Sequence, residues 1–201
     1  MPLVCDDNAT LKRCRWCQGD ALYEAYHDQE WGVPVDSKQA LFERLILEGM
    51  QAGLAWITIL RKRETMREAF FQFDVPRLAK AGGRDLEKWL KNPGVIRHRG
   101  KLEAMVGNAR LADQDQSFVQ FLWSFAPTRH RRHRSANTIP SETAESKAMS
   151  KALKQKGYRF VGPTICYAFM QSVGMVNDHP TSCWRHAICA DAKRPPHGAK
   201  V

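Results

Sequence analysis

Apolar residues recur at intervals of three and four along almost the whole chain, and this spacing limits the possible folds more than any other feature. Such a period forms one apolar stripe along an α-helix, whereas a half-buried strand needs alternation, which the chain lacks over any useful length. We therefore expect an all-α fold. No apolar run approaches the roughly 20 residues that cross a bilayer, so we expect no membrane partner.

Capping residues and prolines divide this pattern into separate helices. Asp20 precedes the first helix, in DALYEAYHDQEW, while Asp36 and Ser37 open the second, SKQALFERLILEGM. The polar, basic stretch 126–142 contains two prolines and is expected to be a long surface loop. The remaining helices are expected at about 56–71, 75–80, 85–90, 99–112, 118–125, 146–156 and 164–173.

Length and charge limit the organisation and the partner. A chain of 201 residues can form one domain or two small ones. A net charge of +10 indicates a polyanionic partner, most commonly nucleic acid, although an acidic protein or a membrane surface also fits. The first residues do not resemble a secretory signal, so we expect the protein in the cytosol. In that reducing compartment, the six cysteines are better candidates for metal ligands or buried thiols than for disulfides.

One carboxylate interrupts the apolar stripe of the second helix. Leu41, Leu45, Glu48 and Ala52 are spaced so that they share one face, which directs Glu48 toward the core. Since a buried unpaired carboxylate is costly, Glu48 must either pair with an Arg or Lys or serve a function. Aromatic residues near such an acid are usually core residues, but together they indicate a pocket for a flat cation. The aromatic residues in question are Trp16, Tyr23, Tyr26, Trp31 and Trp56.

Cysteines and histidines gather at both ends of the chain, in spacings that suit zinc. Cys14, Cys17, His179 and Cys183 form the simplest set of four ligands, and a second set exchanges Cys17 for His27. Buried thiols and ordinary surface histidines remain an equally good interpretation of the spacing alone.

A glycine turn between two predicted helices, in KGYRFVGPTICYAFMQ, has the form of a helical hairpin. Backbone amides at such a turn, next to a helix N-terminus, can bind phosphate. Many hairpins of this kind have no such function, so the motif alone is weak. A second turn, NPGVIRHRGK, is basic and is expected to be a connector.

Taken together, these features resemble the DNA-3-methyladenine glycosylase I family, a zinc-containing branch of the helix-hairpin-helix glycosylases. The resemblance covers about residues 13–183 and rests on long strings in the right order. These strings are LYEAYHDQEWGVP, LEGMQAGLAWITIL, GVIRHRGK, SKALKQKGYRFVGPTICYAFMQ and GMVNDH. It implies a glycosylase domain over 13–187 with two helical lobes and one pocket. Residues 1–12 and the basic tail 188–201 are then expected to be disordered.

The resemblance also implies a ligand set and a base pocket. Zinc would be held by Cys14, His27, His179 and Cys183, with Cys17 beside the site. Four protein ligands leave no open position, so this zinc would join the two chain ends without activating water. The base pocket would consist of Glu48, Tyr23, Tyr26 and Trp56, with Trp16 as a further wall.

The activity that the resemblance implies is hydrolysis of the N-glycosidic bond of 3-methyladenine in double-stranded alkylated DNA, which releases the free base. Asn177 stands near the register of the usual catalytic Asp, and because an amide cannot act as the anionic stabiliser, the resemblance implies that the usual mechanism is absent. Strand-cleaving relatives have Lys just after the hairpin glycine, whereas Pro163 follows Gly162 here, so we expect no strand cleavage. Leu54 with Gln51 is the candidate wedge into the base stack, unless Leu54 belongs to the core. Phosphate contacts are expected from Arg159, Gly162 and Thr164, and from the run RHRRHR at 129–134.

No obligate protein partner is expected. Two other functions fit the same sequence: a zinc-stapled DNA-binding module without catalysis, and a glycosylase with a different lesion range. The carboxylate at Glu48 favours an enzyme, because a module that only binds the DNA backbone needs no acid in an apolar stripe.

Overall fold

The computed structural model describes residues 11–129, 135 and 138–195. Every regular element in this part of the chain is a helix, so the predicted all-α fold is confirmed. The helices are η2 (Arg15–Cys17), α1 (Ala21–Gln29), α2 (Lys38–Gln51), α3 (Trp56–Ala69), η3 (Phe71–Phe73), α4 (Val75–Ala79), α5 (Gly83–Lys91), α6 (Arg99–Gln114), α7 (Phe118–Trp123), α8 (Ala144–Gln155), α9 (Pro163–Ser172) and α10 (Arg185–Asp191).

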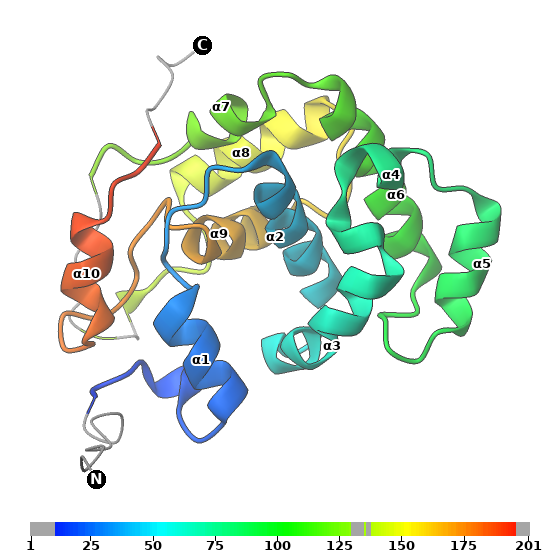
Figure 1. The fold of residues 1–201 in the computed structure, drawn as a ribbon. Coiled ribbons are helices and arrows are strands. Elements are labelled where there is room, and N and C mark those ends of the chain that lie inside the picture. The colour runs from blue at the N-terminus through cyan, green and yellow to red at the C-terminus, as the bar shows by residue number, and fades with distance from the viewer. Residues whose placement is uncertain (1–10, 130–134, 136–137, 196–201) are drawn as a thin grey trace, which may run out of the picture.

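Helix α2 runs through the middle of the molecule, with α9 beside it and the other helices around the pair (Figure 1). Every residue of α2 from Leu41 to Met50 is buried, including its charged ones. A helix buried on all sides must satisfy each polar side chain within the protein or expose it to a cavity. This position is what makes an acid on α2 significant.

Helices α1 and α2 begin directly after the capping residues that the sequence predicted. The Asp20 carboxylate accepts hydrogen bonds from the backbone amides of Leu22 and Tyr23, and the Ser37 hydroxyl accepts one from Ala40. These contacts satisfy amides that have no partner within the helix. Helix α3 ends at Ala69, two residues earlier than predicted, because Phe71 adopts a left-handed conformation with φ of 57°.

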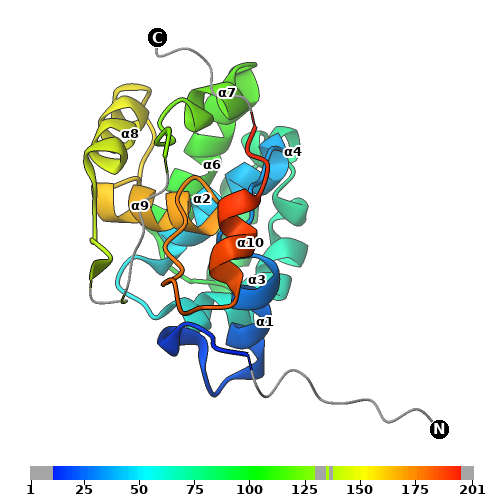
Figure 2. The same cartoon turned by 90° about the vertical axis from the view of Figure 1, so that its left-hand side faces the viewer.

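The two ends of the described chain depart from the sequence prediction. We expected a disordered tail from residue 188, but α10 continues to Asp191, and the buried side chain of Cys189 anchors it. We also expected disorder through residue 12, yet the carbonyl of Lys12 accepts a hydrogen bond from the Trp184 amide at 2.9 Å. The N-terminal segment and the chain leading into α10 therefore lie side by side (Figure 2).

The predicted loop at 126–142 contains no α-helix among its described residues. Most of the basic run 129–134 lies outside the described residues, as do residues 1–10 and 196–201. Within the described ranges, none of the helices combines the length and the apolar character that crossing a membrane requires.

Candidate active site and metal centre

A pocket of about 450 Å³ opens between η2, α1, α2, α3 and α9. This size falls in the range of small-molecule sites. All five residues predicted for the base pocket line it, together with the predicted wedge residue Gln51. Its complete lining is Trp16, Tyr23, Tyr26, Trp31, Glu48, Gln51, Trp56, Ile139, Ala168 and Gln171.

Separate elements bring the aromatic rings to this pocket. Tyr23 and Tyr26 stand three residues apart on one face of α1. The ring of Trp16 packs edge-on against Tyr23 at 5.2 Å, and the ring of Tyr26 is tilted against Trp56 at 5.4 Å. Trp16 remains 37% exposed, so one indole forms a wall that solvent and ligand can reach. The walls can therefore stack against a flat ring.

Glu48 is the acid within these aromatic walls, and its side chain is almost completely buried. Burial raises the pKa of Glu48 to about 8, an effect that Arg44 and a hydrogen bond with Ser172 oppose only in part. A buried carboxylate of this kind favours a positive charge beside it or a proton on it. The pocket can thus attract a cation more strongly than a neutral ligand of the same shape.

The alternative role of Glu48 was an ion pair with a basic residue. Among the described residues, no Lys or Arg forms such a pair with Glu48. Arg44, one turn earlier on α2, instead forms an ion pair with Glu30, which also pairs with Arg63 at 2.8 Å. Because Glu30 holds both guanidinium groups, the carboxylate of Glu48 remains available to the pocket.

Four residues from the two ends of the chain form a second, fully buried cluster. The ligand atoms of Cys14, His27, His179 and Cys183 all lie within 4.8 Å of one another. The sulfur of Cys183 is 3.4 Å from the nearest nitrogens of both histidines, and the sulfur of Cys14 is 3.6 Å from Nδ1 of His179. Tetrahedral ligands at zinc distances would place sulfur and nitrogen about 3.5 Å apart. The cluster therefore has the composition and spacing of a metal site.

The surroundings of the cluster also suit a metal. Nδ1 of His27 contacts the Asp28 carboxylate at 2.7 Å, and Nε2 of His179 contacts the carbonyl of Trp31 at 3.2 Å. Metal-bound histidines commonly use the second ring nitrogen in this way. Cys17 is buried nearby, but its thiol donates to the Cys14 carbonyl at 3.0 Å. The geometry thus favours the set with His27 over the set with Cys17.

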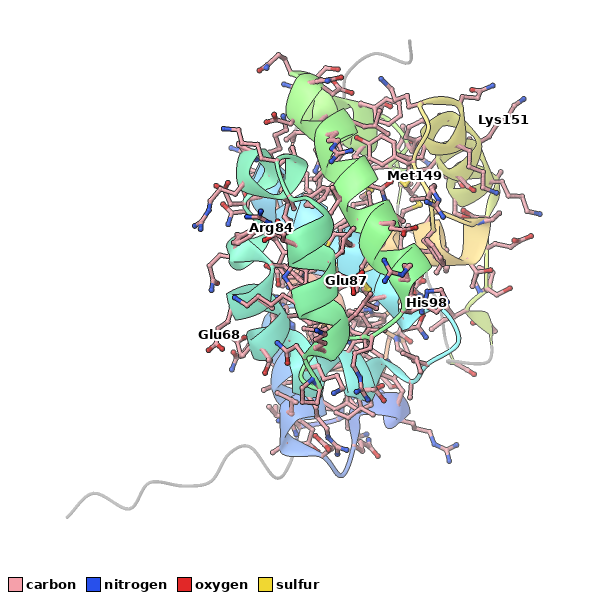
Figure 3. The ribbon with its side chains drawn as sticks, turned by 90° about the vertical axis from the view of Figure 1, so that its right-hand side faces the viewer. Glu68, Arg84, Glu87, His98, Met149 and Lys151 are labelled. Atoms are coloured by element: carbon pink, nitrogen blue, oxygen red, sulfur yellow. The ribbon has the colours of Figure 1, made fainter. Side chains whose placement is uncertain are left out.

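The helical hairpin lies between α8 and α9. The side chain of Asn108 on α6 forms two hydrogen bonds with the backbone of Arg159, and the ring of Phe160 packs edge-on against His98, which is labelled in Figure 3. Arg159 and Thr164 are exposed, while a Cβ at Gly162 would meet no atom within 4 Å. Hydrogen bonds therefore hold the turn against α6, while Arg159 and Thr164 are open to a ligand.

The predicted wedge residues form a turn after α2. The side-chain amide of Gln51 donates to the Leu54 carbonyl at 2.6 Å, and Gly53 has the positive φ of 80° that this turn requires. Leu54 is 38% exposed, so it does not belong to the core. This turn joins Leu54 to Gln51, which lines the pocket, and the role of Leu54 as a wedge stays a prediction.

Sequence reasoning missed three residues of the pocket: Ile139, Ala168 and Gln171. Ile139 comes from the long loop, where no periodic pattern exists. Ala168 and Gln171 stand three residues apart on α9, and only the contact between α9 and α2 shows that this face meets Glu48.

The residues near the register of a catalytic Asp do not line the pocket. Asn177 donates to the His186 carbonyl at 2.9 Å and accepts from the amide of His179. Asp178 is 2% exposed and accepts hydrogen bonds from Tyr167 and Gln171. Both residues therefore stabilise the loop after α9.

Comparison with known proteins gives a consistent result. DNA-3-methyladenine glycosylase 1 of Escherichia coli (strain K12) is 48% identical over 179 residues, which cover 86% of this chain and 96% of that protein. DNA-3-methyladenine glycosylase of Haemophilus influenzae is 47% identical over 182 residues, covering 85% and 96%.

Solved structures agree in fold. A crystal structure of 3-methyladenine DNA glycosylase I has a TM-score of 0.84 and 49% identity, covering 87% of this chain and all of that one. The 3-methyladenine DNA glycosylase I of Staphylococcus aureus has a TM-score of 0.82 and 31% identity, covering 94% and 99%. The family model described as methyladenine glycosylase matches residues 16–186. The chain therefore belongs to the methyladenine glycosylase family.

Proposed function

We propose that this protein hydrolyses the N-glycosidic bond of 3-methyladenine in alkylated double-stranded DNA. The observation that carries the proposal is the buried carboxyl of Glu48, which has aromatic walls and no basic partner among the described residues. The relatives named as 3-methyladenine glycosylases, one of them a variant solved in complex with 3-methyladenine, support it.

The pocket suits this substrate because a 3-methyladenine nucleotide carries a positive charge on its base. Stacking between Trp56 and the other rings favours that cation over normal adenine. The carboxyl group of Glu48 does so too, because a positive charge beside it favours its ionised form. The charged base is already a good leaving group. When the bond to the sugar breaks, the base departs with the bonding electrons as neutral 3-methyladenine, and water adds to the sugar carbon and loses a proton.

The DNA is bound outside the pocket. Backbone amides near Arg159, Gly162 and Thr164 would hold phosphates, because the first amides of a helix have no partner within it. Leu54, supported by Gln51, would fill the gap left by the flipped base. Pro163 follows Gly162, so the hairpin offers no lysine at that position to cleave the strand. We infer that the product is an abasic site in an intact strand.

The metal that fits the buried cluster best is zinc, because two thiolates and two imidazoles form one of its common structural ligand sets. Cys14 and His27 come from the N-terminal segment, and His179 and Cys183 from the C-terminal one. With four protein ligands, the ion would hold these segments together and would take no part in the hydrolysis.

The test is incubation of the protein with methylated duplex DNA, followed by chromatography of the released bases. We expect free 3-methyladenine and an unbroken strand that alkali then cleaves at the abasic site. Normal DNA binding without base release would instead support the alternative function, a DNA-binding module without catalysis. Comparing 3-methyladenine with 7-methylguanine in the same assay determines the lesion range.

A further inference from the structure

A hydrogen-bonded group behind the pocket includes one residue of its wall. Gln171 on α9 lines the pocket, and its side-chain nitrogen donates to Oδ2 of Asp178 at 2.8 Å. The hydroxyl of Tyr167 donates to the same oxygen at 2.6 Å. The Asp178 carboxylate is buried, so these donors replace water as its partners. The side chain of Gln171 is thereby fixed at one end.

The partner of Gln171 also determines which way its amide points. A carboxylate only accepts hydrogen bonds, so the amide nitrogen of Gln171 must face Asp178. The amide oxygen Oε1 then lies on the side away from Asp178. Among the described residues, none donates a hydrogen bond to this oxygen. The pocket wall therefore carries a hydrogen-bond acceptor of fixed orientation to which no described residue donates.

We propose that Gln171, oriented by Asp178, makes the pocket select a methylated purine with an exocyclic amine over one with a carbonyl at the same position. The inference rests on the proposed function, and it assigns to Gln171 the choice between adenine and guanine lesions. The amine of adenine donates hydrogen bonds, whereas O6 of guanine accepts them. An acceptor facing O6 leaves two oxygen atoms without a proton between them, and neither regains the water that it lost.

Glu48 alone cannot make this distinction. Burial raises the pKa of Glu48 to about 8, so near neutral pH its carboxyl group exists both with and without a proton. The protonated form can donate to a carbonyl, and the ionised form can accept from an amine. An amide held against a carboxylate has no second state of this kind. The fixed acceptor is therefore the better discriminator.

The experiment measures kcat/KM for release of 3-methyladenine and of 3-methylguanine from methylated DNA, and competition by the two free bases. Gln171→Met removes the acceptor and keeps a side chain of similar length. We expect the adenine-to-guanine ratio to fall by about tenfold, the value of one lost discriminating hydrogen bond. The same ratio in Gln171→Met and wild type would overturn the inference while leaving the proposed function intact.

Asp178→Asn tests the positioning role. An amide at 178 can donate to Gln171, which is then free to turn its own nitrogen toward the pocket, so the ratio should fall as in Gln171→Met. Tyr167→Phe is the matched control, because Asp178 still accepts from Gln171, and its ratio should stay at the wild-type value. A wild-type ratio in Asp178→Asn would show that Gln171 is oriented without Asp178.

Two further measurements distinguish a failure of this inference from loss of metal in a variant and from a failure of the proposed function. Bound metal is measured in each variant, because Asp178 precedes the predicted ligand His179. If Asp178→Asn has lost metal, the ratio in Gln171→Met alone decides whether Gln171 selects between the two bases. If the wild-type protein releases neither base, the proposed function itself is wrong. A fall in the rates for both bases by the same factor, with no change in their ratio, would also overturn the selective role.

Discussion

At the scale of single residues, burial and charge conflict at Glu48. The folded protein places this carboxyl among aromatic rings and leaves it without an ion pair from any described residue. Removing a carboxylate from water costs several kcal/mol. Retaining it there weakens the fold, which is the usual consequence of building a site for a charged ligand.

We expect this cost to appear in the pH dependence of stability. Burial raises the pKa of Glu48 from 4.5 to about 8, so the folded protein binds more protons than the unfolded chain between these values. Stability contributed at this site is therefore lost as pH rises through that window, by on the order of 4 kcal/mol. Glu48→Gln should remove this dependence and also lower the release of 3-methyladenine at least about tenfold.

Thermal unfolding of wild type and Glu48→Gln at several pH values between 5 and 8 is the measurement. Glu64→Gln is the control, because Glu64 is exposed and lies on α3 outside the pocket lining. Its melting temperature should follow the wild-type curve. Parallel curves for wild type and Glu48→Gln would show that Glu48 is ionised at no cost in the folded protein.

Leu54 allows a test of base flipping that leaves the pocket untouched. Leu54→Ala shortens the side chain that would fill the base stack, so activity on duplex DNA should fall by about tenfold or more. Inhibition by free 3-methyladenine should not change, because Leu54 does not line the pocket. Leu22→Ala, at a leucine of similar exposure on α1, should retain full activity. Weaker inhibition by the free base in Leu54→Ala would instead give Leu54 a role in shaping the pocket.

At the scale of helices, periodicity and capping residues predicted α1 to α9 because each of these helices carries its own start signal or a continuous apolar face. Helix α10 was missed for a physical reason. It has seven residues and no side-chain cap, and its position depends on contacts from other parts of the chain, such as the hydrogen bond from Asn177 to the His186 carbonyl. Such contacts leave no periodic pattern in the local sequence.

The pocket was predictable in part on the same grounds. Glu48 stood out because its place in an apolar stripe is a property of one helix. Gln171 did not, because a glutamine on a helix has no unusual spacing, and its role depends on Asp178 seven residues later. Likewise, spacing alone left the choice between Cys17 and His27 open. The family resemblance implied His27, and the positions of four side chains from both chain ends agree with it.

From the buried cysteine and histidine cluster, we predict that a bound metal holds the N- and C-terminal segments together. Cys183→Ser should lose bound metal and lower the melting temperature by at least about 5 °C, since metal binding to a preformed site stabilises the fold. Cys17→Ser is the matched control, because a serine hydroxyl can still donate to the Cys14 carbonyl. Metal content by elemental analysis and thermal unfolding are the measurements. Loss of metal in Cys17→Ser with retention in Cys183→Ser would reverse the assignment of the ligands.

At the scale of the whole molecule, the charge and the pocket act on different parts of the substrate. The net charge of +10 acts on the phosphates of any DNA, damaged or intact. The pocket carries one acid and uncharged rings, and it acts on a single base. Affinity for DNA and recognition of the lesion should therefore respond differently to salt.

We expect binding to undamaged duplex DNA to weaken by about a hundredfold between 50 and 200 mM salt if about four phosphates are contacted, because each contact releases counterions. Inhibition by free 3-methyladenine should change by less than about twofold over the same range, since burial shields Glu48 from screening. Fluorescence anisotropy measures the first quantity and a competition assay the second. Arg159→Gln should reduce the salt slope for DNA without affecting the free base. An equally steep salt dependence for both ligands would mean that the base is bound by the exposed basic surface and that Glu48 lies outside the binding site.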